Sequence, residues 1–126
     1  MKDARADDAA YRRWFEQHRA KPGDLACQRV ASVAFAYRPL VSIVVPCYKT
    51  DREYLRELLD SVLVQSYDNW ELLLMDASPE WDAVAALAAG ANDERIRRIE
   101  LPGNGGIVVN TERQVSSKAT GDYIAF

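Results

Sequence analysis

The sequence predicts an α/β fold: a Rossmann-like parallel sheet with flanking helices, preceded by an amino-terminal helix. Three observations predict it. Residues 41–45 are almost all apolar and mostly β-branched, which is typical of a strand buried on both faces. An amphipathic helical pattern follows within a few residues, and strand and helix patterns then alternate to the end of the chain. Such alternation from Leu40 onward predicts the order β-α-β-α-β-α-β with right-handed crossovers.

The amino-terminal segment, residues 1–38, is predicted to be a helix and a linker, and the domain itself is assigned to residues 39–126. The helix is expected over 8–20, where one apolar stripe contains Tyr11, Trp14, Phe15 and His18. A Lys-Pro-Gly sequence then ends the helix. Residues 24–38 carry mixed signals and are interpreted as a linker, in which 30–37 form either a short strand or a short helix.

The first strand of the domain is expected to end at Pro46, because proline removes a ladder donor and fixes its own φ. Thr50 and Glu53 have the spacing of a capping box, which predicts that a helix begins there. Apolar residues then recur at helical spacing: Tyr54, Leu55, Leu58, Leu59, Val62 and Leu63.

The second strand, residues 70–75, is continuously apolar apart from one glutamate and closes on Asp76. Ser78 is expected to cap a short alanine-rich helix, because proline follows at the first helical position. This helix is predicted to run to about Ala89, with Gly90 ending it.

A third strand is expected over 96–101, and its charged pair, Arg97 and Arg98, indicates an edge position. The loop 102–106 follows it. The next helix has one face formed by Val108, Thr111, Val115 and Ala119. A fourth strand begins at Asp122, and since the chain stops inside it, we expect the chain to be a fragment of a longer protein. The unpaired outer edge of this strand predicts dimerisation.

Composition excludes several classes of protein. The 16 basic and 19 acidic residues give a net charge of −3 without a basic stripe, which argues against a nucleic-acid partner. No apolar run approaches the roughly 20 residues of a membrane span. Cys27 and Cys47 form no CxxC pattern, so the sequence predicts neither a zinc cluster nor a disulfide framework. We expect a cytoplasmic protein, and attachment to the inner face of the membrane through a longer parent chain stays open.

The candidate nucleotide-binding residues follow the predicted strands. Ligands of open α/β sheets bind outside the carboxyl ends of the strands. The candidates at these positions are Pro46, Tyr48, Lys49, Asp76, Asn104, Gly105 and Gly106.

Each candidate has a structural alternative. Asp76 can accept hydrogen bonds from a base N–H or a ribose hydroxyl, or it can close a turn with Ser78. Tyr48 can stack on a base, or fill the gap between the first strand and its helix. Lys49 can meet a phosphate or stay solvated.

The segment 104–107 leads directly into a helix. Its glycines allow backbone N–H groups to point at an anion, and the helix dipole favours negative charge there. The alternative is a flexible turn, and the pattern matches neither GxGxxG nor the Walker motif. His18 is the single histidine and lies in the separate first helix, where packing is expected. We therefore assign no catalytic and no metal-binding residue.

Four segments in order resemble the start of a glycosyltransferase family 2 domain. They are Val41–Lys49, Leu59–Tyr67 with Trp70–Asp76, Asn104–Ile107, and Ala119–Phe126. The resemblance covers residues 39–126. It implies the GT-A fold, of which this chain would form the nucleotide-binding half, and inverting transfer of a hexosyl group from a UDP or dTDP donor. The acceptor would be a saccharide or a lipid-linked saccharide of a bacterial cell surface. Pro46 and Tyr48 would flank the base, and Asp76 would bind its edge.

The resemblance also implies a divalent cation, Mg²⁺ or Mn²⁺, in the full-length parent. The family's metal-binding DxD motif and its general base follow the fourth strand, which here ends at Phe126. A diphosphate leaving group needs a cation, and the acceptor hydroxyl needs a base. The 126-residue chain is therefore expected to hold no metal and to be inactive alone.

Two alternatives stay open. One is a non-catalytic nucleotide-binding or interaction module derived from a glycosyltransferase, which the unusual Lys49 and Glu112 would suit because the family commonly has Asn at both positions. The other is a sugar-nucleotide pyrophosphorylase. Such enzymes carry a glycine-rich loop after the first strand, whereas residues 46–50 contain no glycine.

Overall fold

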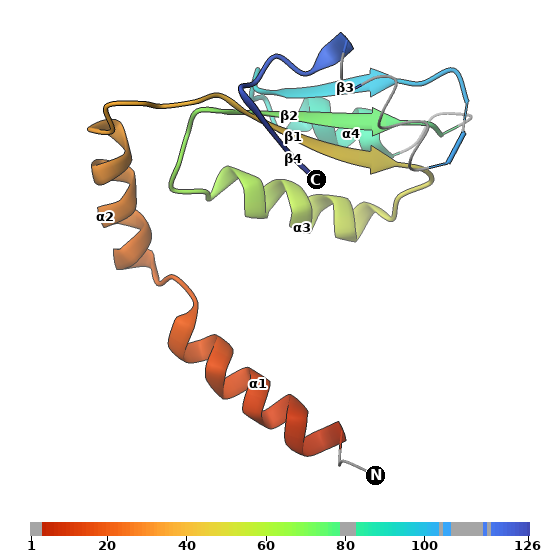
Figure 1. The fold of residues 1–126 in the computed structure, drawn as a ribbon. Coiled ribbons are helices and arrows are strands. Elements are labelled where there is room, and N and C mark those ends of the chain that lie inside the picture. The colour runs from red at the N-terminus through yellow and green to blue at the C-terminus, as the bar shows by residue number, and fades with distance from the viewer. Residues whose placement is uncertain (1–3, 79–82, 104, 107–114, 116) are drawn as a thin grey trace.

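The computed structural model describes residues 4–78, 83–103, 105–106, 115 and 117–126. After an amino-terminal helical segment, strands and helices alternate as predicted over residues 41–100 (Figure 1). In chain order the elements are α1 (Ala4–His18), α2 (Pro22–Val33), β1 (Val41–Cys47), α3 (Arg52–Leu63), β2 (Trp70–Asp76), α4 (Ala83–Gly90), β3 (Ile96–Glu100) and β4 (Tyr123–Ala125).

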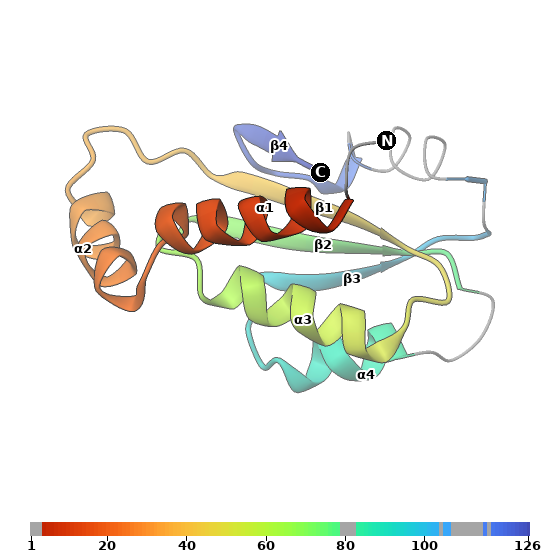
Figure 2. The same ribbon diagram turned by 90° about the horizontal axis from the view of Figure 1, so that it is seen from below.

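Within the described residues, the strands form one parallel sheet in the order β3-β2-β1-β4. The predicted α/β fold is therefore confirmed, as is the edge position of β3. All seven residues of β2 are buried, in keeping with its apolar sequence and its central place. Helices α3 and α4 lie together on one face of the sheet (Figure 2).

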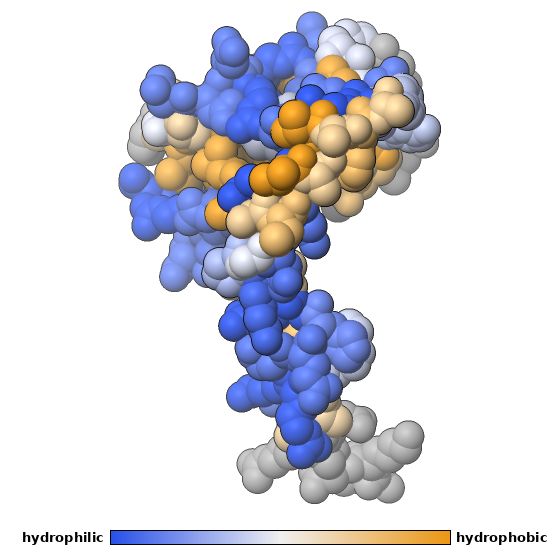
Figure 3. All heavy atoms as spheres, turned by 90° about the vertical axis from the view of Figure 1, so that its left-hand side faces the viewer, coloured by the Kyte–Doolittle hydropathy of each residue, from blue (hydrophilic) through white to orange (hydrophobic). Residues whose placement is uncertain are grey.

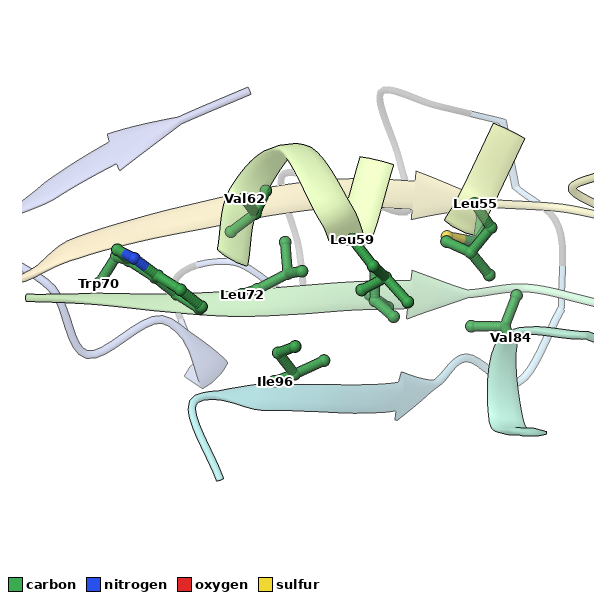
Figure 4. Close-up of a cluster of buried hydrophobic side chains, with 9 residues drawn as sticks. Leu55, Leu59, Val62, Trp70, Leu72, Val84 and Ile96 are labelled. Carbon is green, nitrogen blue, oxygen red and sulfur yellow. The ribbon is translucent and has the colours of Figure 1, made fainter. Parts of the chain in front are cut away.

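Alternate residues of the strands pack on opposite faces of the sheet. On the face of α3 and α4, one cluster of buried side chains joins both helices to the sheet; Figure 4 labels Leu55, Leu59, Val62, Trp70, Leu72, Val84 and Ile96 from it. On the other face, Val44, Leu73 and Met75 pack with Leu101 and Val115. Full burial of each such side chain stabilises the fold by roughly 1.5–3 kcal/mol.

The prediction that Pro46 ends the first strand is wrong, because β1 continues to Cys47 and pairs with β2 along its whole length. The Val41 N–H donates to the Asn69 carbonyl, and the Cys47 carbonyl accepts from the Ala77 N–H. The backbone N–H and carbonyl groups of the odd-numbered residues of β1 therefore point toward β2. The nitrogen of Pro46 consequently faces the β4 side, where pairing reaches only Ile43. The missing N–H therefore removes no ladder hydrogen bond.

The linker interpretation of residues 24–38 is also wrong in its first part, where α2 forms. Pro22 occupies the first turn of this helix rather than ending the previous one, and the Lys21 backbone N–H donates to Asp24 Oδ2 at 2.8 Å. Polar contacts hold α2 to the loop after α3: Arg29 Nη2 donates to the Val64 carbonyl at 2.9 Å. A helix held by polar contacts lacks the apolar periodicity by which sequence patterns are recognised.

The helix after β1 begins one residue later than the capping box predicts. Asp51, not Thr50, is the N-cap, and its carboxylate accepts a 2.8 Å hydrogen bond from the Glu53 backbone N–H. Threonine and aspartate both act as N-caps, so Thr50 and Asp51 were both possible N-cap residues for this helix. Of the predicted apolar face, Leu55, Leu59 and Val62 are buried.

Helix α1 extends away from the sheet (Figure 1) and forms a mostly hydrophilic projection (Figure 3). It spans Ala4–His18 rather than 8–20. Its predicted stripe is present, but Tyr11, Trp14 and Phe15 are 44–60% exposed, and the Tyr11 ring stacks on each of the other two. His18 stacks on Trp14 at 4.7 Å between ring centroids, so its packing is local to the helix.

Two predicted features lie outside the described residues. These are the proline after Ser78 and most of the helix expected between the glycine loop and Thr120, including Glu112.

Candidate nucleotide-binding cleft

The carboxyl ends of β1, β2 and β3 lie side by side at one edge of the sheet. Cys47 is in register with Asp76, and Asp76 is in register with Glu100. The segments that follow these residues therefore meet. They enclose a cleft of about 400 Å³, lined by Tyr48, Ala77, Ser78, Glu100, Leu101, Pro102 and Gly103.

Tyr48 lines this cleft with 48% of its surface exposed, so it does not fill the gap between β1 and α3. The Lys49 ammonium lies 5.6 Å from the centre of the Tyr48 ring. Lys49 has a φ of 47°, a left-handed conformation, and its backbone N–H donates to Ser78 Oγ at 2.9 Å. This hydrogen bond ties the loop after β1 to the loop after β2.

Asp76 lies beneath the cleft rather than on its surface, with none of its surface exposed. Its Oδ1 accepts a 3.0 Å hydrogen bond from the Ser78 backbone N–H, which is the turn that the sequence offered as an alternative. Its Oδ2 accepts a 2.7 Å hydrogen bond from Arg98 Nε. Burial raises the pKa of Asp76, but the hydrogen bonds from Arg98 and Ser78 outweigh it, so the pKa is lowered overall.

The glycine loop contributes Gly103 to the lining of the cleft. Gly106 has a φ of 87°, which a residue with a Cβ rarely adopts. Gly105 and Gly106 are exposed, Asn104 lies outside the described residues, and Pro46 is exposed within β1. The structure thus brings Tyr48 and Lys49 together with the residues that follow Asp76.

Two features of the site were missed by sequence reasoning. Glu100 lines the cleft, although its sequence position indicated only the end of an edge strand. Arg98 pairs with Asp76 across two neighbouring strands. Both residues could have been found only from the register between β2 and β3, which places Asp76 beside Glu100. The sequence patterns of the two separate strands do not contain this register.

A second polar network lies on the opposite face of the sheet from Asp76. The nearly buried Glu71 accepts hydrogen bonds from Ser42 Oγ, the Thr120 backbone N–H and Arg97 Nη2, each at 2.6 Å. Burial raises the pKa of Glu71, but these hydrogen bonds outweigh it and lower the pKa. Because Glu71 holds the segment that leads into β4, this network positions a strand rather than a ligand.

The described residues contain no group of three or more histidine, cysteine or acidic side chains placed to hold a metal ion. None of the described helices is both long enough and apolar enough to cross a membrane.

Comparison with known proteins identifies a family. The sequence model described as Glycosyl transferase family 2 matches residues 42–126. That match includes β1 to β4 and all the residues that line the cleft. No solved structure gives a significant match.

Several curated proteins are similar to the chain. The uncharacterized protein y4gI of Sinorhizobium fredii is 36% identical over 94% of this chain and 13% of its own length. TuaG of Bacillus subtilis, provisionally named a teichuronic acid biosynthesis glycosyltransferase, is 33% identical over 71% of this chain and 35% of its own length. The O-antigen biosynthesis protein RfbC of Myxococcus xanthus is 29% identical over 84% of this chain and 8% of its own length. The chain therefore spans 8–35% of the lengths of these relatives.

Proposed function

The chain belongs to glycosyltransferase family 2, and we propose that it forms the nucleotide-binding part of an enzyme that transfers a sugar from a UDP or dTDP donor. The observation that carries this proposal is the cleft at the carboxyl ends of β1, β2 and β3, with the exposed ring of Tyr48 in its wall. Such an edge is where α/β sheets bind nucleotides, and an aromatic ring offers a face on which any base can stack.

The proposed roles follow from the positions of the residues. Tyr48 stacks on the base, with Pro46 beside it at the end of β1. Lys49 provides positive charge for the diphosphate. The glycine loop, with Asn104, Gly105 and Gly106, offers backbone N–H groups to the phosphates, since glycine permits their close approach. Asp76 holds the loop after β2 in place through Ser78, and its proposed contact with the base requires that the buried carboxylate be uncovered.

We propose that the acceptor is a growing saccharide or a lipid-linked saccharide of the cell surface. The names of two relatives support this proposal, since one refers to teichuronic acid biosynthesis and the other to O-antigen biosynthesis. We place the reaction in the cytoplasm, at the inner face of the membrane for a longer parent chain.

We further propose that the parent uses Mg²⁺ or Mn²⁺, which stabilises charge on the leaving diphosphate when bound. The described residues present no cluster fit to hold this ion, so we derive no step through it. Acceptor deprotonation likewise needs a base, which we propose lies in a longer parent chain. Isolated residues 1–126 are expected to bind nucleotide without turnover.

Titration of the chain with UDP and dTDP, followed by calorimetry and NMR, tests the proposal. Millimolar or tighter binding is expected, with shifts at Tyr48 and the glycine loop. Tyr48→Ala should weaken binding about tenfold, because stacking on a base contributes about 1–3 kcal/mol. Tyr11→Ala, which removes a similarly exposed ring from α1, is the matched control and should change nothing. Absence of any response at millimolar nucleotide from the folded chain would refute the proposal.

One observation favours a second candidate, the non-catalytic interaction module. Asp76, the acid expected at the base, is fully buried and paired with Arg98. The module alternative predicts that the folded chain binds neither UDP nor dTDP, so the same titration separates the two functions.

A further inference from the structure

Two carboxylates end neighbouring strands at the cleft, and their environments are opposite. Asp76 ends β2 and has no exposed surface, whereas the side chain of Glu100, which ends β3, is 75% exposed and lines the cleft. The two residues are in register across the parallel pair. Of these two carboxylates, the one that a ligand in the cleft can contact without a rearrangement is therefore that of Glu100.

Asp76 is held in place by the fold itself. One of its oxygens accepts from Arg98 Nε at 2.7 Å and the other from the Ser78 backbone N–H at 3.0 Å. Ala77 and Ser78, which follow it, line the cleft in its place. To reach a base, Asp76 would have to break its pair with Arg98, and leaving a buried charge without its partner is strongly unfavourable.

Glu100 is held loosely by the same arginine. Arg98 Nη1 lies 3.4 Å from Glu100 Oε2, a longer contact than the one to Asp76. Arg98 thus neutralises Asp76, and among the described residues its long contact is the one side-chain hydrogen bond to the Glu100 carboxylate, whose other acceptor sites face no described donor. Tyr48 lines the same cleft, so a base stacked on its ring would present an edge to the surrounding side chains.

The chemistry of that edge distinguishes bases. An ionised carboxylate accepts hydrogen bonds and donates none. Uracil and thymine carry a proton on the ring nitrogen N3, whereas N3 of cytosine carries a lone pair. A carboxylate facing N3 therefore attracts the first two bases and repels the third.

We propose that Glu100 is the specificity-determining carboxylate of this cleft and that it selects pyrimidines with a protonated N3, uracil and thymine, over cytosine. This inference rests on the proposed function, because it assumes that a nucleotide occupies the cleft.

The test compares UDP with CDP, which share the ribose, the diphosphate and the shape of the ring. For the wild-type chain we expect UDP to bind at least about tenfold more tightly, as hydrogen bonds to charged groups contribute about 1.5–3 kcal/mol. Glu100→Gln should reduce this ratio to about threefold or less, because an amide can donate to N3 of cytosine as well as accept. Methylation of UDP at N3 should weaken its binding to the wild type but not to Glu100→Ala.

Glu57→Gln, on the exposed side of α3, is the matched control and should preserve the ratio. If Glu100→Gln binds UDP and CDP with the wild-type ratio, the inference is wrong while nucleotide binding stands. If instead Asp76→Asn folds and abolishes the ratio, Asp76 reads the base. If no nucleotide binds the folded wild-type chain, the proposed function fails, and this inference fails with it.

Discussion

Glu71 in β2 accepts a 2.6 Å hydrogen bond from the backbone N–H of Thr120, which lies three positions before β4. Ser42 of β1 completes this contact, because its hydroxyl donates to Glu71 and accepts from the Gly121 N–H at 2.9 Å. The polar network thus fixes where the chain enters β4, although β4 pairs only with β1. It also explains why a glutamate stands in β2, whose other residues before Asp76 are apolar.

Replacement of this carboxylate should destabilise the protein. Glu71→Gln removes the charge that pairs with Arg97 and leaves one hydrogen-bond donor without an acceptor. We expect the free energy of unfolding to fall by about 1–3 kcal/mol, measured by urea denaturation. Glu57→Gln, on the exposed side of α3, should change it by less than about 0.5 kcal/mol. Equal stability of the two variants would contradict a structural role for Glu71.

Gly121 should tolerate no larger residue. A Cβ at this position would lie 2.6 Å from Ser42 Oγ and 2.7 Å from both the Leu40 carbonyl oxygen and the Ser42 nitrogen. Since two of these atoms belong to the backbone of β1 and its entry, we expect Gly121→Ala to lower the free energy of unfolding by about 1–3 kcal/mol.

Two further variants make this prediction specific. Gly23→Ala, where a Cβ meets nothing within 4 Å, should leave the denaturation midpoint nearly unchanged. Ser42→Ala in the Gly121→Ala background removes just one of the three close contacts, so stability should stay low. Full recovery in that double variant would show that the hydroxyl alone limits the position.

Stability should fall in acid because of paired carboxylates. The pKa values of Asp76 and Glu71 are lowered in the folded protein by their hydrogen bonds, despite burial, and that of Asp93 is lowered by Arg95. A lowered folded pKa means that the unfolded chain binds protons first. The stabilisation is therefore complete above about pH 5 and is lost as the pH falls through about 4 toward the folded pKa values.

Urea denaturation between pH 7 and pH 3 measures this effect. Asp76→Asn should be less stable than the wild type at pH 7, with the difference narrowing in acid. A difference that stays constant over the whole range would show that the Asp76 carboxylate does not contribute through its charge.

The outer edge of β4 should drive self-association at high concentration. This strand ends the sheet, and Tyr123, Ile124 and Phe126 are 46–83% exposed. Exposed apolar edges pair with other strands, and lysine on an edge prevents it. Sedimentation velocity should show dimers that Ile124→Lys abolishes and Val30→Lys, on exposed α2, does not. A monomer at all concentrations would refute the prediction.

Much of the fold was predictable because its signals are local. The buried strand β2 is recognised from its own residues, and so is the face of α3 formed by Leu55, Leu59 and Val62. Helix α2 was missed because polar contacts with a loop 35 positions later hold it, as between Arg29 and Val64. β1 continues through Pro46 because the proline nitrogen faces the β4 side of the strand, where no pairing reaches it. The local sequence does not show which neighbouring strand this nitrogen faces.

The candidate site was likewise predictable only in part. That Tyr48, Lys49 and Asp76 follow strand ends could be stated from the sequence, and the parallel sheet does place them at one edge. Their roles differ because Asp76 is buried and paired with Arg98, whereas Tyr48 lines the cleft. Glu100, at the end of the neighbouring strand, lines the same cleft.

The sequence by itself determined the alternation of strands and helices over residues 41–100 and the residues at the ends of these strands, since periodicity and turn chemistry depend on near neighbours. Tertiary structure alone decided which charged groups are paired and which face the cleft. The physical reason is that burial and ion pairing depend on the register between strands, which joins residues such as Asp76 and Arg98 that lie 22 positions apart.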